Sequence, residues 1–127
     1  MSEHPNATLI RQQAEAMKNG DMQATIDGLA DDVVWHEIGS PEPIHGKAAV
    51  AARWAGMSDA GGSFSVELHD VVANDDHAVA LVTATVSMGD HTFSYRTAEI
   101  YHMRDGKITE RWAFSDDTAA INAFFAG

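Results

Sequence analysis

Residues 64–115 read FSVELHDVVANDDHAVALVTATVSMGDHTFSYRTAEIYHMRDGKITERWAFS, and this stretch decides the fold class of the 127-residue chain. Runs rich in valine, threonine, alanine and aromatic residues alternate with short polar turns, a spacing typical of hairpins. We expect strands at residues 64–73, 77–88, 91–104 and 107–115. Asp105-Gly106 is a strong type I′ turn signal, because both central residues of that turn need positive φ. The stretch therefore predicts a meander of antiparallel strands.

The residues before this meander show the periodicity of helices. We expect helices at residues 6–19, 21–29 and 46–57, a strand at 33–38 and a tail helix at 117–125. Gly20 is expected to end the first helix and Asp21 to cap the second. Helices followed by antiparallel strands indicate an α+β fold, with the three helices covering the concave face of a curved sheet. Such an arrangement leaves a pocket between helices and sheet.

Length and composition are those of a single globular unit. The chain has 45% hydrophobic and 21% charged residues, close to the values of ordinary globular proteins. No repeat or linker-like stretch divides it, so we expect one domain over residues 1–127. A chain of this length buries roughly two-thirds of the surface that its unfolded form exposes, which is enough for a core without disulfides.

The charge balance and the apolar pattern argue against several classes of partner. Eight Lys and Arg against 19 Asp and Glu give a net charge of −11, which disfavours nucleic acids and anionic lipid surfaces. No apolar run approaches the roughly 20 residues of a membrane span. The N-terminus lacks the basic and apolar regions of a signal peptide, so we expect a cytoplasmic protein. A small, hydrophobic, uncharged ligand is the expected partner.

No metal site is expected. The chain has no cysteine, and its seven histidines are scattered singly, without the spacing of paired metal ligands.

Glu37 is the first candidate for acid–base chemistry. In the expected strand it shares a face with Val33 and Trp35, because alternate residues point to the same side. Burial beside apolar groups would raise its pKa toward neutrality, as a general base requires. The alternative is that the short strand twists and Glu37 meets solvent beside the loop at Pro41.

Glu99 is the second candidate. It shares a strand face with Tyr95, Thr97 and Tyr101, which suggests a pocket or a dry interface. A protonated Glu99 could donate a hydrogen bond to an oxyanion. The alternative is an ion pair with Arg96 or Arg111 on an outward face.

Aromatic residues are the candidates for lining the pocket. Tryptophan is more often part of a core than of a binding site, but in a cone the core and the pocket lining are one surface. We therefore expect Trp35, Trp54 and Tyr101 to contact a ligand. Trp112, which alternation places on one face with Ile108 and Glu110, is a further candidate.

Three segments carry a resemblance to a known superfamily. They are LADDVVWHE at residues 29–37, the helix opening that contains Gly46, Val50 and Trp54, and RDGKITERW at residues 104–112. Together they resemble the SnoaL-like and ketosteroid isomerase-like members of the nuclear transport factor 2-like superfamily, and the match covers nearly the whole chain. The resemblance implies a cone-shaped fold and a homodimer that pairs through the sheet.

The resemblance also implies roles for individual residues. The catalytic base of ketosteroid isomerase falls on Glu37, and its protonated carboxyl group falls on Glu99. The position of its tyrosine falls on Gln13, which is not an acid. SnoaL-like cyclases carry an aspartate before the tail helix, which corresponds here to Asp117, with Asp116 as the alternative.

The expected function is proton transfer without a cofactor, by an isomerase or polyketide cyclase, on a hydrophobic carbonyl or polyketide-like ligand. An activated C–H bond requires only a tuned base, so no cofactor is expected. A dehydratase (a lyase) or an epoxide hydrolase would instead bring a histidine such as His36, His45 or His102 to a buried carboxylate. A non-catalytic binding or dimerisation module is the third possibility, because this superfold hosts many functions.

Overall fold

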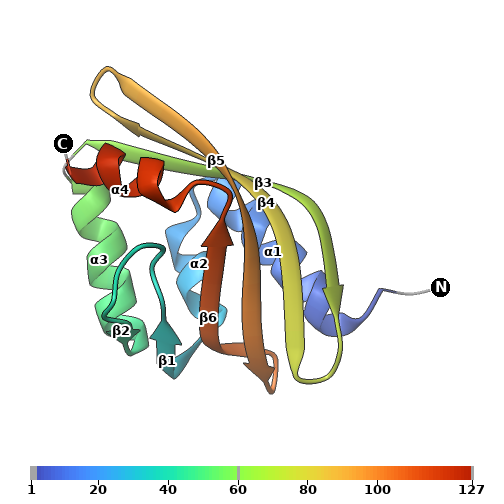
Figure 1. The fold of residues 1–127 in the computed structure, drawn as a ribbon. Helices are drawn as coiled ribbons and strands as arrows, with labels where there is room; N and C mark the ends of the chain where they lie inside the picture. Colours follow the sequence, from blue (N-terminus) through green and yellow to red (C-terminus); the bar gives the residue numbers. More distant parts are fainter. Residues whose placement is uncertain (1–2, 60, 127) are drawn as a thin grey trace.

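The computed structural model describes residues 3–59 and 61–126, and Figure 1 shows its fold. The helices are α1 (Pro5–Lys18), α2 (Met22–Asp27), α3 (Lys47–Asp59) and α4 (Thr118–Ala126). The strands are β1 (Leu29–Trp35), β2 (Ile44–His45), β3 (Gly62–Ala73), β4 (His77–Met88), β5 (His91–Arg104) and β6 (Lys107–Ser115).

The strands form one curved sheet in the order β2-β1-β6-β5-β4-β3. The pairs β3–β4, β4–β5 and β5–β6 are antiparallel, as the meander predicts, whereas β1 runs parallel to β6. The helices α1, α2 and α3 lie on one side of the sheet (Figure 1). This arrangement confirms the predicted α+β fold with three helices on one face of a curved sheet. The sheet is mixed rather than wholly antiparallel, because β1 is parallel to β6.

The core lies between these helices and the inner face of the sheet. Ile10 of α1, Ile26 of α2 and Val50 of α3 pack with Val33 of β1 and Ile108 of β6, and all five are buried. Within the described ranges, no helix has the length and apolarity needed to cross a bilayer.

The hairpin turn between β5 and β6 is as predicted. Asp105 and Gly106 have φ values of 54° and 76°. Two successive positive φ values are the signature of a type I′ turn, whose twist matches that of the strands it joins.

The predicted strand at residues 33–38 is shifted in the structure. β1 begins at Leu29 and ends at Trp35, so Glu37 lies in the loop that follows it. Pairing explains the early start, because Leu29 pairs with Ile108 of β6 and Trp35 pairs with Arg111. The two-residue strand β2, antiparallel to the end of β1, was not predicted.

A bulge in β6 changes which residues face the core. His102 pairs with Glu110 and Met103 pairs with Ile108, so Thr109 is an extra residue on the β6 side. Ile108 and Arg111 consequently share the buried face, although they are three residues apart. The sequence-based assignment of Trp112 to the face of Ile108 is wrong for this reason.

Candidate functional site

A buried carboxylate is the centre of the candidate site. Glu99 projects from the inner face of β5, between Thr97 and Tyr101, and all three residues are buried. The Tyr101 hydroxyl donates to Glu99 Oε1 at 2.7 Å, and the Thr97 hydroxyl donates to Oε2 at 3.0 Å. Strand alternation therefore supplies both hydroxyl partners of the carboxylate from one strand.

Arg111 of β6 completes this network. Its Nη2 lies 3.2 Å from Glu99 Oε1, and its Nη1 donates to the backbone oxygen of His36 at 2.9 Å. The guanidinium carbon lies 4.5 Å from the centroid of the Trp35 ring, which in turn meets Trp54 of α3 edge to face at 5.2 Å. We call Thr97, Glu99, Tyr101 and Arg111 the Glu99 network.

The charge state of Glu99 differs from the sequence-based expectation. Burial alone would raise its pKa, but the charge of Arg111 and the hydrogen bonds from Tyr101, Arg111 and Thr97 outweigh burial, so the pKa is lowered. Glu99 is therefore ionised at neutral pH, and the expectation of a protonated, hydrogen-bond-donating Glu99 is wrong. The bulge at Thr109 is the cause, because it turns Arg111 toward the core.

Tyr101 and Arg111, which contact Glu99, have protonation states that complement an ionised carboxylate. Burial, followed by the nearby charge of Glu99, raises the pKa of Tyr101 well above its ordinary value. For Arg111, burial works against the charge but Glu99 more than compensates, so its pKa is raised. Tyr101 is thus a neutral donor and Arg111 a permanent cation.

One donor of Arg111 is left without a partner. Its Nε is buried and makes no hydrogen bond. In the described part of the chain, every other buried side-chain nitrogen or oxygen has a hydrogen-bond partner. Leaving a buried donor unsatisfied costs about 1–3 kcal/mol, and more when the group is charged. A ligand oxygen that reached this N–H would satisfy it.

Glu37 lies at a wetter position. Its side chain is 29% exposed, and both carboxylate oxygens lie 3.3 Å from Nε of Arg53 on α3. The structure thus places Glu37 between the two sequence-based alternatives, neither fully buried nor free in solvent.

The pKa of Tyr95 depends on both Glu37 and the Glu99 network. Its pKa is raised first by burial and then by Glu99 and Glu37, with Arg111 acting in the opposite direction. Tyr95 is therefore within electrostatic range of both carboxylates.

The C-terminal helix packs over the beginning of β5. Ile121 is buried, and the Phe124 ring stacks on Phe93 with centroids 5.6 Å apart. In addition, α4 approaches the loop after β1 at Gly39, where a Cβ would lie 2.0 Å from Asn122 Oδ1. These contacts bring α4 against the same loop that carries Glu37.

Asp117 and Gln13 lie away from the Glu99 network. Asp117 is exposed and caps α4, because its Oδ1 accepts a hydrogen bond from the Ala120 N–H at 3.0 Å. Its alternative, Asp116, pairs with Arg96 on the exposed surface. Gln13 lies between α1 and α2, where its Nε2 donates to the Thr25 oxygen at 2.7 Å.

Trp112 faces the outer side of the sheet, so the expectation that it lines the cone is wrong. It stacks on His36 with centroids 5.1 Å apart and meets His102 edge to face. His36 Nε2 lies 2.8 Å from Glu110 Oε2 on this outer side. The histidine–carboxylate pair that a dehydratase would need is therefore not part of the buried site, and His45 is exposed.

No group of three or more histidine, aspartate or glutamate side chains suited to a metal ion occurs within the described ranges.

Several solved structures share this fold. An epoxide hydrolase of the LEH-like type from Mycobacterium tuberculosis matches with a TM-score of 0.81 and 20% identity, over 97% of this chain and 91% of that one. A protein from Xanthomonas campestris, provisionally assigned as a polyketide cyclase, matches with a TM-score of 0.76 and 23% identity, over 96% and 95%. A protein of unknown function with a cystatin-like fold, from Xanthomonas campestris, matches with a TM-score of 0.84 and 22% identity, over 94% of this chain and 96% of that one.

The family assignment comes from the sequence itself. No curated protein matches the chain significantly. The model of the SnoaL-like domain, in contrast, matches residues 10–111, which include β1, most of the meander and every member of the Glu99 network. The chain belongs to the SnoaL-like domain family.

Proposed function

We propose that this SnoaL-like protein is a small-molecule enzyme that transfers a proton, without a cofactor, on a hydrophobic carbonyl or polyketide-like ligand. The observation that carries the proposal is the unpartnered Nε–H of Arg111, a buried cationic donor next to aromatic side chains. Preorganised donors of this kind stabilise the negative charge that develops on a carbonyl oxygen.

In this mechanism Arg111 takes the electrophilic role that the family resemblance assigns to a protonated carboxyl group. The ligand's carbonyl oxygen accepts a hydrogen bond from Nε, and its negative charge grows as the neighbouring carbon loses a proton. Glu99 does not touch the ligand but holds the guanidinium through Nη2. It is therefore a positioning residue.

Glu37 is the proposed base. It follows His36, whose backbone oxygen is held by Arg111, so base and donor are connected through one short segment. The carboxylate takes the proton from the carbon next to the carbonyl group, and an enolate forms. Glu37 then returns the proton to another carbon, which gives an isomer. Alternatively, the enolate carbon attacks a second carbonyl carbon of the same ligand, whose C=O π bond breaks and whose oxygen takes the proton from Glu37, which closes a ring.

The charges around the site favour a neutral ligand. Glu99 is balanced by Arg111, and Glu37 is balanced by Arg53. A ligand with a carboxylate or phosphate group would add an unpaired charge within a chain that already carries −11. Aromatic rings such as Trp35 suit the apolar body of the ligand.

Deuterium exchange tests the proposal directly. Neutral cyclic ketones, beginning with α-tetralone, are incubated with the protein in D₂O, and loss of the α-proton signal is followed by NMR. We expect Glu37→Gln to slow exchange by roughly 10²–10⁴-fold, the contribution of a positioned base. Arg111→Lys should slow it by roughly 10²–10³-fold. Equal exchange rates for wild type and Glu37→Gln would contradict the proposed base.

Epoxide opening is the second candidate, and the ionised state of Glu99 favours it. A carboxylate held ionised can accept a proton from an attacking water, while Arg111 Nε donates to the epoxide oxygen. The fold shared with an LEH-like epoxide hydrolase is consistent with this reaction. Hydrolysis of styrene oxide separates the two candidates: it should depend on Glu99 and tolerate Glu37→Gln.

The outer face of the sheet is proposed to pair with a second copy of the chain. Val72, Leu81 and Phe114 are 63%, 49% and 61% exposed. Leu81 pairs with Ala98, which pairs with Phe114, so Leu81, Ala98 and Phe114 form an apolar row across β4, β5 and β6. Val72 lies on the neighbouring strand β3. Phe114→Glu should convert a dimer to a monomer in light scattering, whereas Ala52→Glu on exposed α3 should not. A wild-type monomer at high concentration would contradict this pairing.

A further inference from the structure

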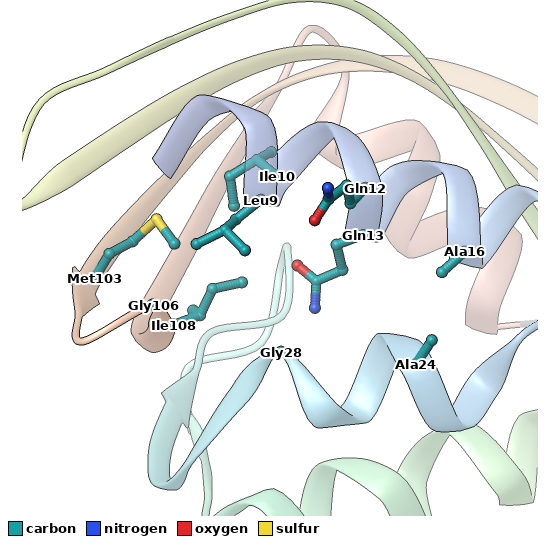
Figure 2. A pocket seen from close by; sticks show the side chains of 10 residues that line it. All are labelled: Leu9, Ile10, Gln12, Gln13, Ala16, Ala24, Gly28, Met103, Gly106 and Ile108. Carbon is teal, nitrogen blue, oxygen red and sulfur yellow. The ribbon is translucent and has the colours of Figure 1, made fainter. Parts of the chain in front are cut away.

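A cavity of about 200 Å³, partly open to solvent, lies between α1, α2 and the β5–β6 hairpin, outside the Glu99 network (Figure 2). Its apolar lining is formed by Leu9, Ile10, Met103 and Ile108, and two amides of α1, Gln12 and Gln13, stand beside it. Neither Glu99 nor Arg111 contributes to the lining.

Small residues leave this space open. Ala16 of α1 and Ala24 of α2 face the cavity, and their side chains are too short to fill it (Figure 2). Gly106 is fixed as glycine by the hairpin turn, where its φ is 76°. The cavity thus follows from the local sequence of both helices and of the hairpin.

The Gln13 amide is held in one orientation. Its Nε2 donates to the Thr25 oxygen at 2.7 Å. A Cβ at Gly28 would lie 3.0 Å from this nitrogen, so glycine leaves the room that the amide uses. Oε1 consequently turns away from α2, toward Leu9 (Figure 2). An oriented acceptor in an apolar surround selects for a ligand that carries a hydrogen-bond donor.

The lining disfavours a charged ligand, because none of its residues carries a charge. A charged group placed there would lose hydration without gaining a counter-charge. The volume is also informative, since a dry cavity of about 150 Å³ in another protein accepts benzene, whereas drug-sized ligands need about 300 Å³ or more.

We propose that this cavity is a second binding site, for a small neutral molecule with one apolar ring or short chain and one hydroxyl or N–H group. The apolar part packs against Met103 and Ile108, and the donor binds Gln13 Oε1. The site is independent of the function proposed for the Glu99 network.

Three probes of equal ring size test the site: benzyl alcohol, toluene and benzoate. Binding is followed by ¹H–¹³C NMR of the methyl groups of Leu9, Ile10, Met103 and Ile108. Benzyl alcohol should shift these signals in a saturable manner. Toluene should bind roughly two- to tenfold more weakly, because it lacks one hydrogen bond. Benzoate should bind most weakly of the three. The proposal would be overturned if benzoate bound as tightly as benzyl alcohol, or if the largest shifts were centred on Trp35.

Two variants make the location explicit. Ala24→Leu fills the cavity at its solvent-exposed mouth and should abolish the benzyl alcohol shifts, whereas Ala52→Leu, on the exposed side of α3, should leave them unchanged. Gln13→Leu should remove the preference for benzyl alcohol over toluene while toluene still binds. Retention of benzyl alcohol binding in folded Ala24→Leu would place the ligand elsewhere and overturn the assignment.

Discussion

Glu99 and Arg111 form a buried ion pair across β5 and β6, with 3.2 Å between Oε1 and Nη2. Both residues are more than nine-tenths buried, and Arg111 also holds the backbone of His36. The pair therefore joins β6 to the segment that carries Glu37. It places a fixed cation in the core of a chain whose net charge is strongly negative.

Breaking this pair from one side should be strongly destabilising. Arg111→Met leaves the Glu99 carboxylate buried without its counter-charge, and such changes cost about 3–5 kcal/mol. Urea unfolding followed by tryptophan fluorescence measures the loss. The double variant Glu99→Leu/Arg111→Met should recover part of it, because no charge is then left buried. As a control, Arg96→Met removes a mostly exposed partner of Asp116 and should change stability far less. Equal losses for Arg96→Met and Arg111→Met would show that the buried pair has no special weight.

Acid should weaken the fold through Glu99. Its pKa in the folded chain is lowered, while in the unfolded chain it stays near the ordinary value of about 4.3. The unfolded chain then binds the proton more readily, so this contribution is complete above about pH 4.3 and is lost as pH falls through the folded pKa. The free energy of unfolding should drop more steeply below pH 4.3 in wild type than in Glu99→Gln. Parallel curves for the two proteins would contradict an ionised Glu99.

The sequence predicts the architecture well because its signals are local. The turn at Asp105-Gly106 and the runs on either side of it set the meander, and the strands at 77–88, 91–104 and 107–115 have the predicted bounds. Helix periodicity and the glycine at position 20 give α1 to within one residue.

The site is harder to predict because it depends on one residue of register. Simple alternation places Trp112 with Ile108, whereas the bulge at Thr109 places Arg111 there instead. Nothing in RDGKITERW marks the bulge, since the partner residues on β5 decide it. The aromatic neighbours of Glu99 on its strand indicate a buried carboxylate. Its charge state cannot be predicted from them, because that state depends on Arg111.

The two tyrosines should resist ionisation in the folded protein. Tyr95 and Tyr101 are the only tyrosines in the sequence, and burial followed by the charge of Glu99 raises the pKa of both. An absorbance titration should therefore show the phenolate steps of the native protein at higher pH than in concentrated urea, where both groups should titrate near the ordinary value of about 10. Since the unfolded chain loses these protons first, stability should fall as pH rises above about 10. A native step at the ordinary value would indicate exposed hydroxyls.

Gly39 should be intolerant of a side chain for two separable reasons. Its φ is 79°, and a Cβ would lie 2.0 Å from Asn122 Oδ1 of α4. Gly20 provides the matched control, because its φ is 74° but nothing lies within 4 Å of its Cβ position. Both Gly20→Ala and Gly39→Ala pay for the left-handed backbone, about 1–2 kcal/mol, so any excess loss at Gly39 measures the collision with α4. Asn122→Ala in the Gly39→Ala background should remove that excess in urea unfolding, because it deletes the colliding amide. If both glycine variants lose equal stability, α4 does not pack against this loop in solution, and Glu37 is then freer than the contact implies.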